Sequence, residues 1–317
     1  MKNSNLILTH SNEGIEFAKK KFPKYAHKIK YEIHPIKSKI ASTPFIKEYM
    51  IGQDNYLIES SSEKATEQKK YCAIYFSSNN LYYPNTEAEF NNAIVTKNRF
   101  EWYGTRIEKA SKHIFLRDVF KQWYLKGVNA EINHPDALLE FLKQETKGFE
   151  IITLGSSSGG FAAVYYGQLL AAETTYSFNG QYEVDSLLRK SSKEVDPILF
   201  RNQNDTNLRT YYDIFKVIKT PSKIFYFRSN KSEWDVEQYT HIKDLGINTF
   251  SFNTSHHGIP FAKTALPKVL NMDLSKINKF RNRNLNPVIF SFQVAGFKQT
   301  MKAVWAVAQK LLKKIGL

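Results

Sequence analysis

The chain is poor in cysteine. Cys72 is its single thiol among 317 residues, so no disulfide bond can form within the chain. This scarcity is typical of proteins from a reducing compartment. Long apolar runs are also missing: none approaches the roughly 20 residues that a transmembrane helix needs, and the apolar stretch at residues 6–8 is too short for a signal-peptide core. We therefore expect a cytoplasmic protein, with peripheral contact at the inner membrane left open.

Acidic residues are in the minority. The chain has 30 Asp and Glu against 45 Lys and Arg, which gives a formal net charge of +15 at pH 7. Such an excess favours an anionic partner, for example nucleic acid, anionic lipid or an acidic polysaccharide. The basic residues are spread along the chain without an Arg-rich arm or a zinc-finger or RRM signature, so we predict no specific nucleic-acid recognition. A basic surface without a dedicated partner is the other interpretation.

Disorder is excluded by composition, because 42% of the residues are hydrophobic and 14% are aromatic. From residue 70 onward, short apolar segments alternate with helical patterns. Such alternation predicts an α/β protein with a mainly parallel sheet and helices on both faces. The predicted strands are 71–76, 114–116, 150–154, 174–178, 223–227 and 247–252, and the predicted helices are 137–146, 159–172, 208–217 and 236–245.

The alternation divides the chain into three regions. Residues 1–69 are basic and weakly periodic and end in a polar run at 59–64 that looks like a linker, so we assign them to an N-terminal accessory region. Residues 70–275 form the predicted catalytic domain. Residues 276–317 form a basic tail that ends in an amphipathic helix. One face of this helix carries Phe297, Met301, Val304, Trp305, Ala308, Leu311 and Ile315, with lysines opposite, and it suits docking on its own domain, a membrane surface or a partner.

The sharpest motif lies at residues 155–160, which read Gly-Ser-Ser-Ser-Gly-Gly and fit G-x-S-x-G with Ser157 at the centre. The motif stands between an apolar strand and a helix of small residues. In a nucleophile elbow, a strained turn lifts the serine hydroxyl above the sheet edge, and glycine is needed where strand and helix nearly touch. We predict that Ser157 is the nucleophile, and a Gly/Ser loop that binds phosphate is the alternative.

A serine nucleophile needs a base and an acid that orients the base, and in this fold they follow in the order serine, acid, histidine. The predicted strand 247–252 leads to two adjacent histidines; we choose His257, with His256 as the alternative. The loop after strand 223–227 offers two carboxylates; we choose Asp235, with Glu233 as the alternative. Asp235 also fits the N-cap of the following helix, through a capping box.

An oxyanion hole needs two backbone N–H groups. One normally comes from the residue after the nucleophile, here Ser158. The other comes from a loop after an early strand, where Ser78 and Asn79 are the candidates. This loop lacks the usual glycines, so an ordinary polar turn explains it equally well.

Charged and aromatic side chains crowd residues 117–124, directly after the predicted strand 114–116. Aromatic rings beside guanidinium and ammonium groups suit a sugar or an anionic group, although a structural Arg–Asp pair beside core aromatics fits the pattern equally well. Residues 177–181 follow the strand after the elbow and could line the same cleft. The predicted substrate-binding residues are Arg117, Gln122, Trp123 and Gln181, and no metal ligand is predicted.

Several of these segments together resemble a known family. Residues 75–79, 115–118, 121–124, 155–160, 177–181 and 257–258 are similar to α/β-hydrolase-like proteins encoded with bacterial capsule biosynthesis genes, including capsular polysaccharide O-acetyltransferases. The resemblance covers residues 70–260. Ser158 departs from it, because a small residue such as alanine is more usual at that position.

The resemblance implies an α/β-hydrolase-like fold and a triad that moves acetyl from acetyl-CoA to a sugar hydroxyl on a cytoplasmic polymer. In this sequence the triad maps to Ser157, Asp235 and His257. The implied acceptor is an anionic polysaccharide, with contact to a membrane or a capsule complex through the C-terminal helix. A serine esterase or deacetylase, and a non-catalytic component of a capsule assembly complex, are the alternatives.

Overall fold

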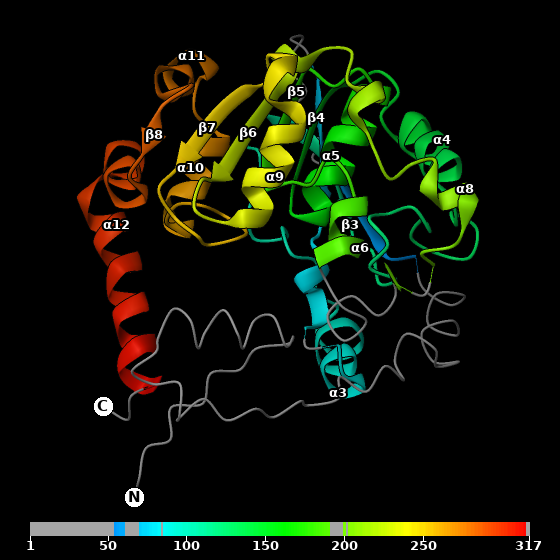
Figure 1. Ribbon diagram of the computed structural model, residues 1–317, viewed down its shortest axis with the longest axis horizontal. Helices are drawn as coiled ribbons and strands as arrows, with labels where there is room; N and C mark the ends of the chain where they lie inside the picture. Colours follow the sequence, from blue (N-terminus) through cyan, green and yellow to red (C-terminus); the bar gives the residue numbers. More distant parts are fainter. Residues whose placement is uncertain (1–53, 61–69, 84, 191–198, 201, 315–317) are drawn as a thin grey trace, which may run out of the picture.

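The computed structural model describes residues 54–60, 70–83, 85–190, 199–200 and 202–314 (Figure 1). This part of the chain forms an eight-stranded sheet in the order β1-β3-β2-β4-β5-β6-β7-β8. β1 is antiparallel to β3, and every other neighbouring pair is parallel. The strands are β1 (Tyr56–Ser60), β2 (Tyr71–Phe76), β3 (Ala110–Leu116), β4 (Glu150–Ser156), β5 (Thr174–Phe178), β6 (Ile224–Ser229), β7 (Asn248–Phe252) and β8 (Asn284–Leu285).

Both faces of the sheet are buried, because alternate residues of each central strand enter two different apolar clusters. In β2, Cys72 and Ile74 join the cluster under α4 (Pro135–Glu145), α5 (Ser158–Leu169) and α9 (Glu233–Ile242). Tyr75 faces the other cluster, which α10 (Leu266–Leu270), α11 (Leu274–Ile277) and the start of α12 (Pro287–Lys314) supply. Figure 1 shows α4, α5 and α9 together on one side of the sheet. The predicted α/β fold, with an α/β-hydrolase-like sheet, is confirmed.

Several predicted elements match the structure closely. β2 and β5 have the predicted bounds, and β3, β4, β6, β7, α4, α5 and α9 differ from prediction mainly at their ends. The predicted helix at 208–217 is wrong. Only α8 (Thr206–Arg209) and a 3₁₀ turn at Phe215–Val217 form there, because Tyr212 and Ile214 pair through their backbones with Val184 and Tyr182. This tertiary pairing overrides the local helical pattern.

The sheet extends past both boundaries drawn from the sequence. β1 begins at Tyr56 and pairs with the whole length of β3, so the polar run at 59–64 starts within a strand. At the other edge, β8 from the basic tail pairs with β7. Both are edge strands whose residues are half-buried or exposed, which explains their weak apolar signal. Residues 1–53 and 61–69 of the accessory region lie outside the described residues.

The C-terminal helix α12 has a break at Gly296 (φ 80°, ψ 173°) that separates two helical halves. The first half packs on the sheet through Phe290, and the second half extends away from the sheet (Figure 1). On the second half Phe297, Met301 and Trp305 are 71%, 40% and 63% exposed. Their spacing of four residues places them on one face. None of the described helices is both long and apolar enough to span a membrane.

Candidate active site

Ser157 lies at a sharp turn between the end of β4 and the start of α5. Its backbone has φ 53° and ψ −123°, a strained conformation for a residue with a side chain, which costs about 1–3 kcal/mol. A Cβ atom on Gly155 would lie 2.1 Å from the carbonyl oxygen of Gly159, and one on Gly159 would lie 2.2 Å from that of Phe76. Both positions therefore require glycine, and the motif forms the expected strand–turn–helix elbow.

The structure brings Ser157, His257 and Asp235 together. The Ser157 Oγ atom lies 2.8 Å from His257 Nε2, and His257 Nδ1 lies 2.9 Å from Asp235 Oδ1. Both distances are those of good hydrogen bonds. A carboxylate is only an acceptor, so Nδ1 carries the proton and donates it to Asp235, which leaves Nε2 to accept the serine hydroxyl. This is the geometry of a nucleophile, a base and an acid that orients the base.

The ends of three parallel strands, β4, β6 and β7, deliver these side chains to one edge of the sheet. Ser157 follows β4, Asp235 lies in the first turn of α9 after β6, and His257 lies in the loop after β7. Parallel strands place their carboxyl ends at the same edge, which is where such sheets bind ligands. Residues separated by 100 positions in the chain therefore meet.

The structure distinguishes the two acid candidates. Ser232 is the N-cap of α9, and its hydroxyl accepts the N–H of Asp235 at 3.4 Å. Asp235 is therefore not the cap, and the capping-box interpretation of it is wrong. Its side chain is 1% exposed and meets His257, whereas Glu233 in the same turn is exposed. Burial leaves Asp235 Oδ2 without a hydrogen-bond partner in the described part of the chain.

His256, the alternative base, contributes mainly its backbone. Its carbonyl oxygen accepts the Ser229 hydroxyl at 2.6 Å and the Asn179 side-chain amide at 3.2 Å, and these bonds anchor the histidine loop to β5 and β6. Burial, together with the neighbouring His257 and Lys263, lowers the pKa of His256. Its ring is therefore neutral at pH 7 and adds no charge beside the triad.

Gln181 joins the triad from the loop after β5. Its amide nitrogen lies 3.3 Å from Ser157 Oγ, and its Oε1 accepts the indole N–H of Trp123 at 2.8 Å. An indole can only donate, so the orientation of the amide is determined and the NH₂ group faces Ser157. Both side chains are almost fully buried, at 4% and 3% exposed. The sequence predicted substrate binding for both residues, and the structure places them in a hydrogen-bond chain behind the nucleophile.

The loop that carries Trp123 is organised by Asp118. This buried carboxylate accepts the backbone N–H groups of Phe120, Gln122 and Tyr124 at 2.7–3.0 Å. Burial raises the pKa of Asp118 to about 6, and these hydrogen bonds oppose the rise. The loop contains the strained positive φ angles of Lys121, Trp123 and Tyr124, so Asp118 compensates for local strain.

Arg117 and Gln122 are not brought to Ser157. Each is 2% exposed. Arg117 donates from Nε to Asn55 Oδ1 at 2.9 Å and stacks on Phe100. Gln122 Oε1 accepts the side-chain amide of Asn202 at 3.2 Å. Substrate binding was predicted for both, yet their polar groups hold the loop and the sheet edge together. In the alternative interpretation of this segment, a structural Arg–Asp pair, Asp118 would bond to Arg117, but its carboxylate instead accepts backbone N–H groups of the loop.

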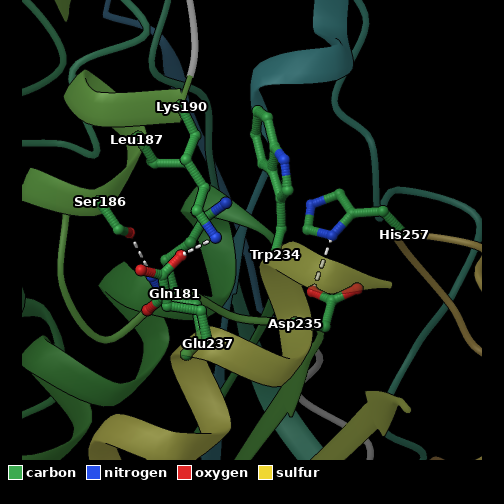
Figure 2. A pocket seen from close by; sticks show the side chains of 9 residues that line it. Gln181, Ser186, Leu187, Lys190, Trp234, Asp235, Glu237 and His257 are labelled. Atoms are coloured by element: carbon green, nitrogen blue, oxygen red, sulfur yellow. Dashed lines mark hydrogen bonds and ion pairs between the residues drawn. The ribbon is translucent and has the colours of Figure 1, made fainter. Parts of the chain in front are cut away.

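A cavity of about 340 Å³ opens at Ser157. A second, small pocket is lined by Asp235, His257, Gln181, Trp234 and the Lys190–Glu237 ion pair of 2.6 Å (Figure 2). No cluster of three or more His, Cys, Asp or Glu side chains in the described ranges is arranged to hold a metal ion. The cavity is lined by Ser78, Asn80, Glu101, Ser156, Ser157, His256, His257, Gly258, Ile259 and Lys263.

Of the three predicted oxyanion-hole residues, Ser78 lines this cavity, whereas Ser158 and Asn79 are not among the lining residues. Ser158 is the first residue of α5, so its N–H has no acceptor within the helix, and its hydroxyl donates to Asn79 Oδ1 at 3.0 Å. The N–H of Ser78 donates to the carboxylate of Glu101 at 2.6 Å. Sequence reasoning missed Glu101, which lies in a turn between β2 and β3 without any recognisable motif.

Changing Gln181 to Glu tests the orientation of the amide. Trp123 keeps an acceptor, but the atom facing Ser157 becomes an acceptor instead of a donor. The serine hydroxyl then turns from His257 to the new carboxylate, and we expect the acylation rate of Ser157 to fall about 100-fold, since general-base catalysis contributes roughly 10²–10⁴-fold. Stopped-flow acylation by an activated ester measures this rate. Gln144→Glu, on the exposed side of α4, is the matched control, and an unchanged rate in Gln181→Glu contradicts the assignment.

No model of a known protein family matches the chain, and no curated protein matches it. Solved structures similar to it include the capsule O-acetyltransferase of Neisseria meningitidis serogroup A, with 14% identity over 62% of this chain and 80% of that one and a TM-score of 0.38. The S-formylglutathione hydrolase of Staphylococcus aureus is similar at 11% identity over 62% and 82% of the two chains, also with a TM-score of 0.38. The class of this protein is defined by its own sheet order and elbow, which are those of an α/β-hydrolase-like fold.

Proposed function

We propose that this protein is a serine-dependent acyltransferase that moves acetyl from acetyl-CoA to hydroxyl groups of an anionic, capsule-type polysaccharide. The observation that carries the proposal is the hydrogen-bond chain from Ser157 through His257 to Asp235. It supplies each group needed to form and resolve an acyl-enzyme.

In the first half-reaction, Ser157 Oγ attacks the thioester carbonyl as His257 Nε2 takes the hydroxyl proton. Asp235 stabilises the imidazolium that results, and Gln181 steadies the attacking oxygen. Backbone N–H groups at the start of α5 and after β2 suit the negative charge that develops on the carbonyl oxygen. The carbon–sulfur bond then breaks, and the imidazolium returns its proton to the departing thiolate.

In the second half-reaction, a sugar hydroxyl attacks the ester on Ser157. His257 removes the proton of this hydroxyl and delivers it to Ser157 Oγ as the serine ester breaks. Acetyl leaves on the sugar and the free serine is restored, so no further reactant is required. Water in place of the sugar would give hydrolysis by the same steps.

The cavity at Ser157 is the proposed site for the acyl and thiol end of acetyl-CoA. Its volume of about 340 Å³ is at the lower end of the usual ligand-pocket range of roughly 300–1,000 Å³. Lys263 lines it and offers a cation to an anionic group of either substrate. The polysaccharide acceptor is supported by the net charge of +15 and by the sequence resemblance around the elbow.

Incubating the protein with acetyl-CoA and a panel of acidic and neutral capsular polysaccharides tests the proposal, with free thiol and sugar-bound acetyl measured in parallel. We expect CoA release that increases with an acidic polymer and equals the acetyl found on it. Ser157→Ala should abolish both signals. A rate of CoA release that is the same with and without every polymer would identify a hydrolase instead.

A further inference from the structure

The cavity in front of Ser157 contains a carboxylate that the triad does not use. Glu101 lines this cavity and accepts the backbone N–H of Ser78 through Oε2 at 2.6 Å. A hydrogen bond from a backbone N–H to a carboxylate is stronger than one between two neutral groups. Glu101 therefore holds the backbone donor that follows β2.

The position of Ser78 makes this donor important. β2 lies directly beside β4, with Phe76 opposite Gly155 of the elbow. The N–H of Ser77 remains in the sheet and donates to Leu116 O at 3.1 Å. The N–H of Ser78 is thus the first donor past the strand end that is directed away from the sheet, and in an elbow hydrolase the second oxyanion donor comes from this loop.

The turn that carries Glu101 is fastened to the end of β2. The N–H of Glu101 donates to Ser77 Oγ at 3.3 Å, and the indole N–H of Trp102 donates to Phe76 O at 2.8 Å. The backbone of Glu101 is therefore held in place, while its half-buried side chain faces an open cavity. The carboxylate can leave Ser78 by rotating its side chain, without moving the turn.

We propose that Glu101 is an internal occupant of the oxyanion hole, which the carbonyl oxygen of the acyl donor must displace. This inference rests on the proposed function. A carboxylate oxygen and a tetrahedral oxyanion carry similar charge and use the same donor, and one N–H cannot serve both fully. In the free protein the Glu101 carboxylate therefore occupies the oxyanion hole, and acylation begins when this carboxylate releases the N–H of Ser78.

The test is the second-order rate of inactivation by a fluorophosphonate, whose phosphoryl oxygen needs the oxyanion hole. Glu101→Ala opens the hole, and we expect the rate to rise about tenfold, since a hydrogen bond to a charged group is worth more than one to water. Glu101→Gln keeps a neutral acceptor in place, so its rate should lie between those of the wild type and the alanine variant. Glu87→Ala, which removes an exposed acidic residue from α3 (Glu87–Phe90), is the matched control.

Glu101→Asp distinguishes two effects of the carboxylate: its hydrogen bond to the N–H of Ser78 and its negative charge in the cavity. Its carboxylate is one methylene too short to reach Ser78 but leaves the negative charge in the cavity, so occupancy predicts a rise like that of Glu101→Ala. A rise in the alanine and glutamine variants without one in Glu101→Asp would overturn the inference in favour of simple charge repulsion. An unchanged or lower rate in Glu101→Ala would overturn it as well. Labelling of the wild type at Ser157 shows in each case that the triad itself is active.

Discussion

Ser157→Ala is expected to abolish labelling by a fluorophosphonate and to lower acetyl transfer about 10⁶-fold, the size of loss that follows removal of the nucleophile from a serine triad. The Oγ atom of Ser157 lies 2.8 Å from a histidine that is itself held by a carboxylate. Alanine keeps the small side chain of the elbow, so the fold should remain. Intact-mass spectrometry of the labelled protein measures the result.

Ser156→Ala is the control for this experiment. Ser156 is the last residue of β4 and is the immediate neighbour of the nucleophile, with 5% of its surface exposed. Its variant should keep its label. A label that persists in Ser157→Ala would remove the basis of the proposed mechanism, and the absence of any label in the wild type would favour a non-catalytic component of an assembly complex.

Asp235→Asn is expected to lower acetyl transfer about 10⁴-fold, as loss of the orienting carboxylate does in other triads. An amide can present its NH₂ group to His257 Nδ1, which then becomes the acceptor and moves the ring proton to Nε2. His257 can no longer accept the Ser157 hydroxyl in that tautomer. The ratio of turnover in the variant and the wild type measures the effect.

Two measurements distinguish a catalytic effect of Asp235→Asn from a loss of folded protein. Asp235 is buried and its Oδ2 has no partner within the described residues, so the neutral amide should cost little stability and the thermal midpoint should change little. Glu233→Gln removes the exposed carboxylate two residues earlier and should keep full activity. Full activity in Asp235→Asn, or a loss of activity in Glu233→Gln alone, would contradict the assignment and make Glu233 the acid that orients His257.

The local features of the site were readable in the sequence. Glycine at 155 and 159 with serine at 157 predicted a tight strand-to-helix turn, because strand and helix nearly touch at those two positions. The alternation of apolar strands with helices predicted the parallel sheet. The order of serine, acid and histidine that is usual in this fold then pointed to the loops after two later strands. The elbow and the individual strands and helices depend on residues close together in the chain, where periodicity and turn chemistry carry the information.

The tertiary structure decided the features that depend on distant neighbours. Burial of the 117–124 loop around Asp118 turned Trp123 inward, where its indole fixes the Gln181 amide. Pairing with Tyr182 and Val184 replaced the helix expected near residue 212. The contact between Glu101 and Ser78 joins two loops that share no motif. Periodicity and turn chemistry describe how a segment folds by itself, whereas the partner of a polar group is set by which segments pack together.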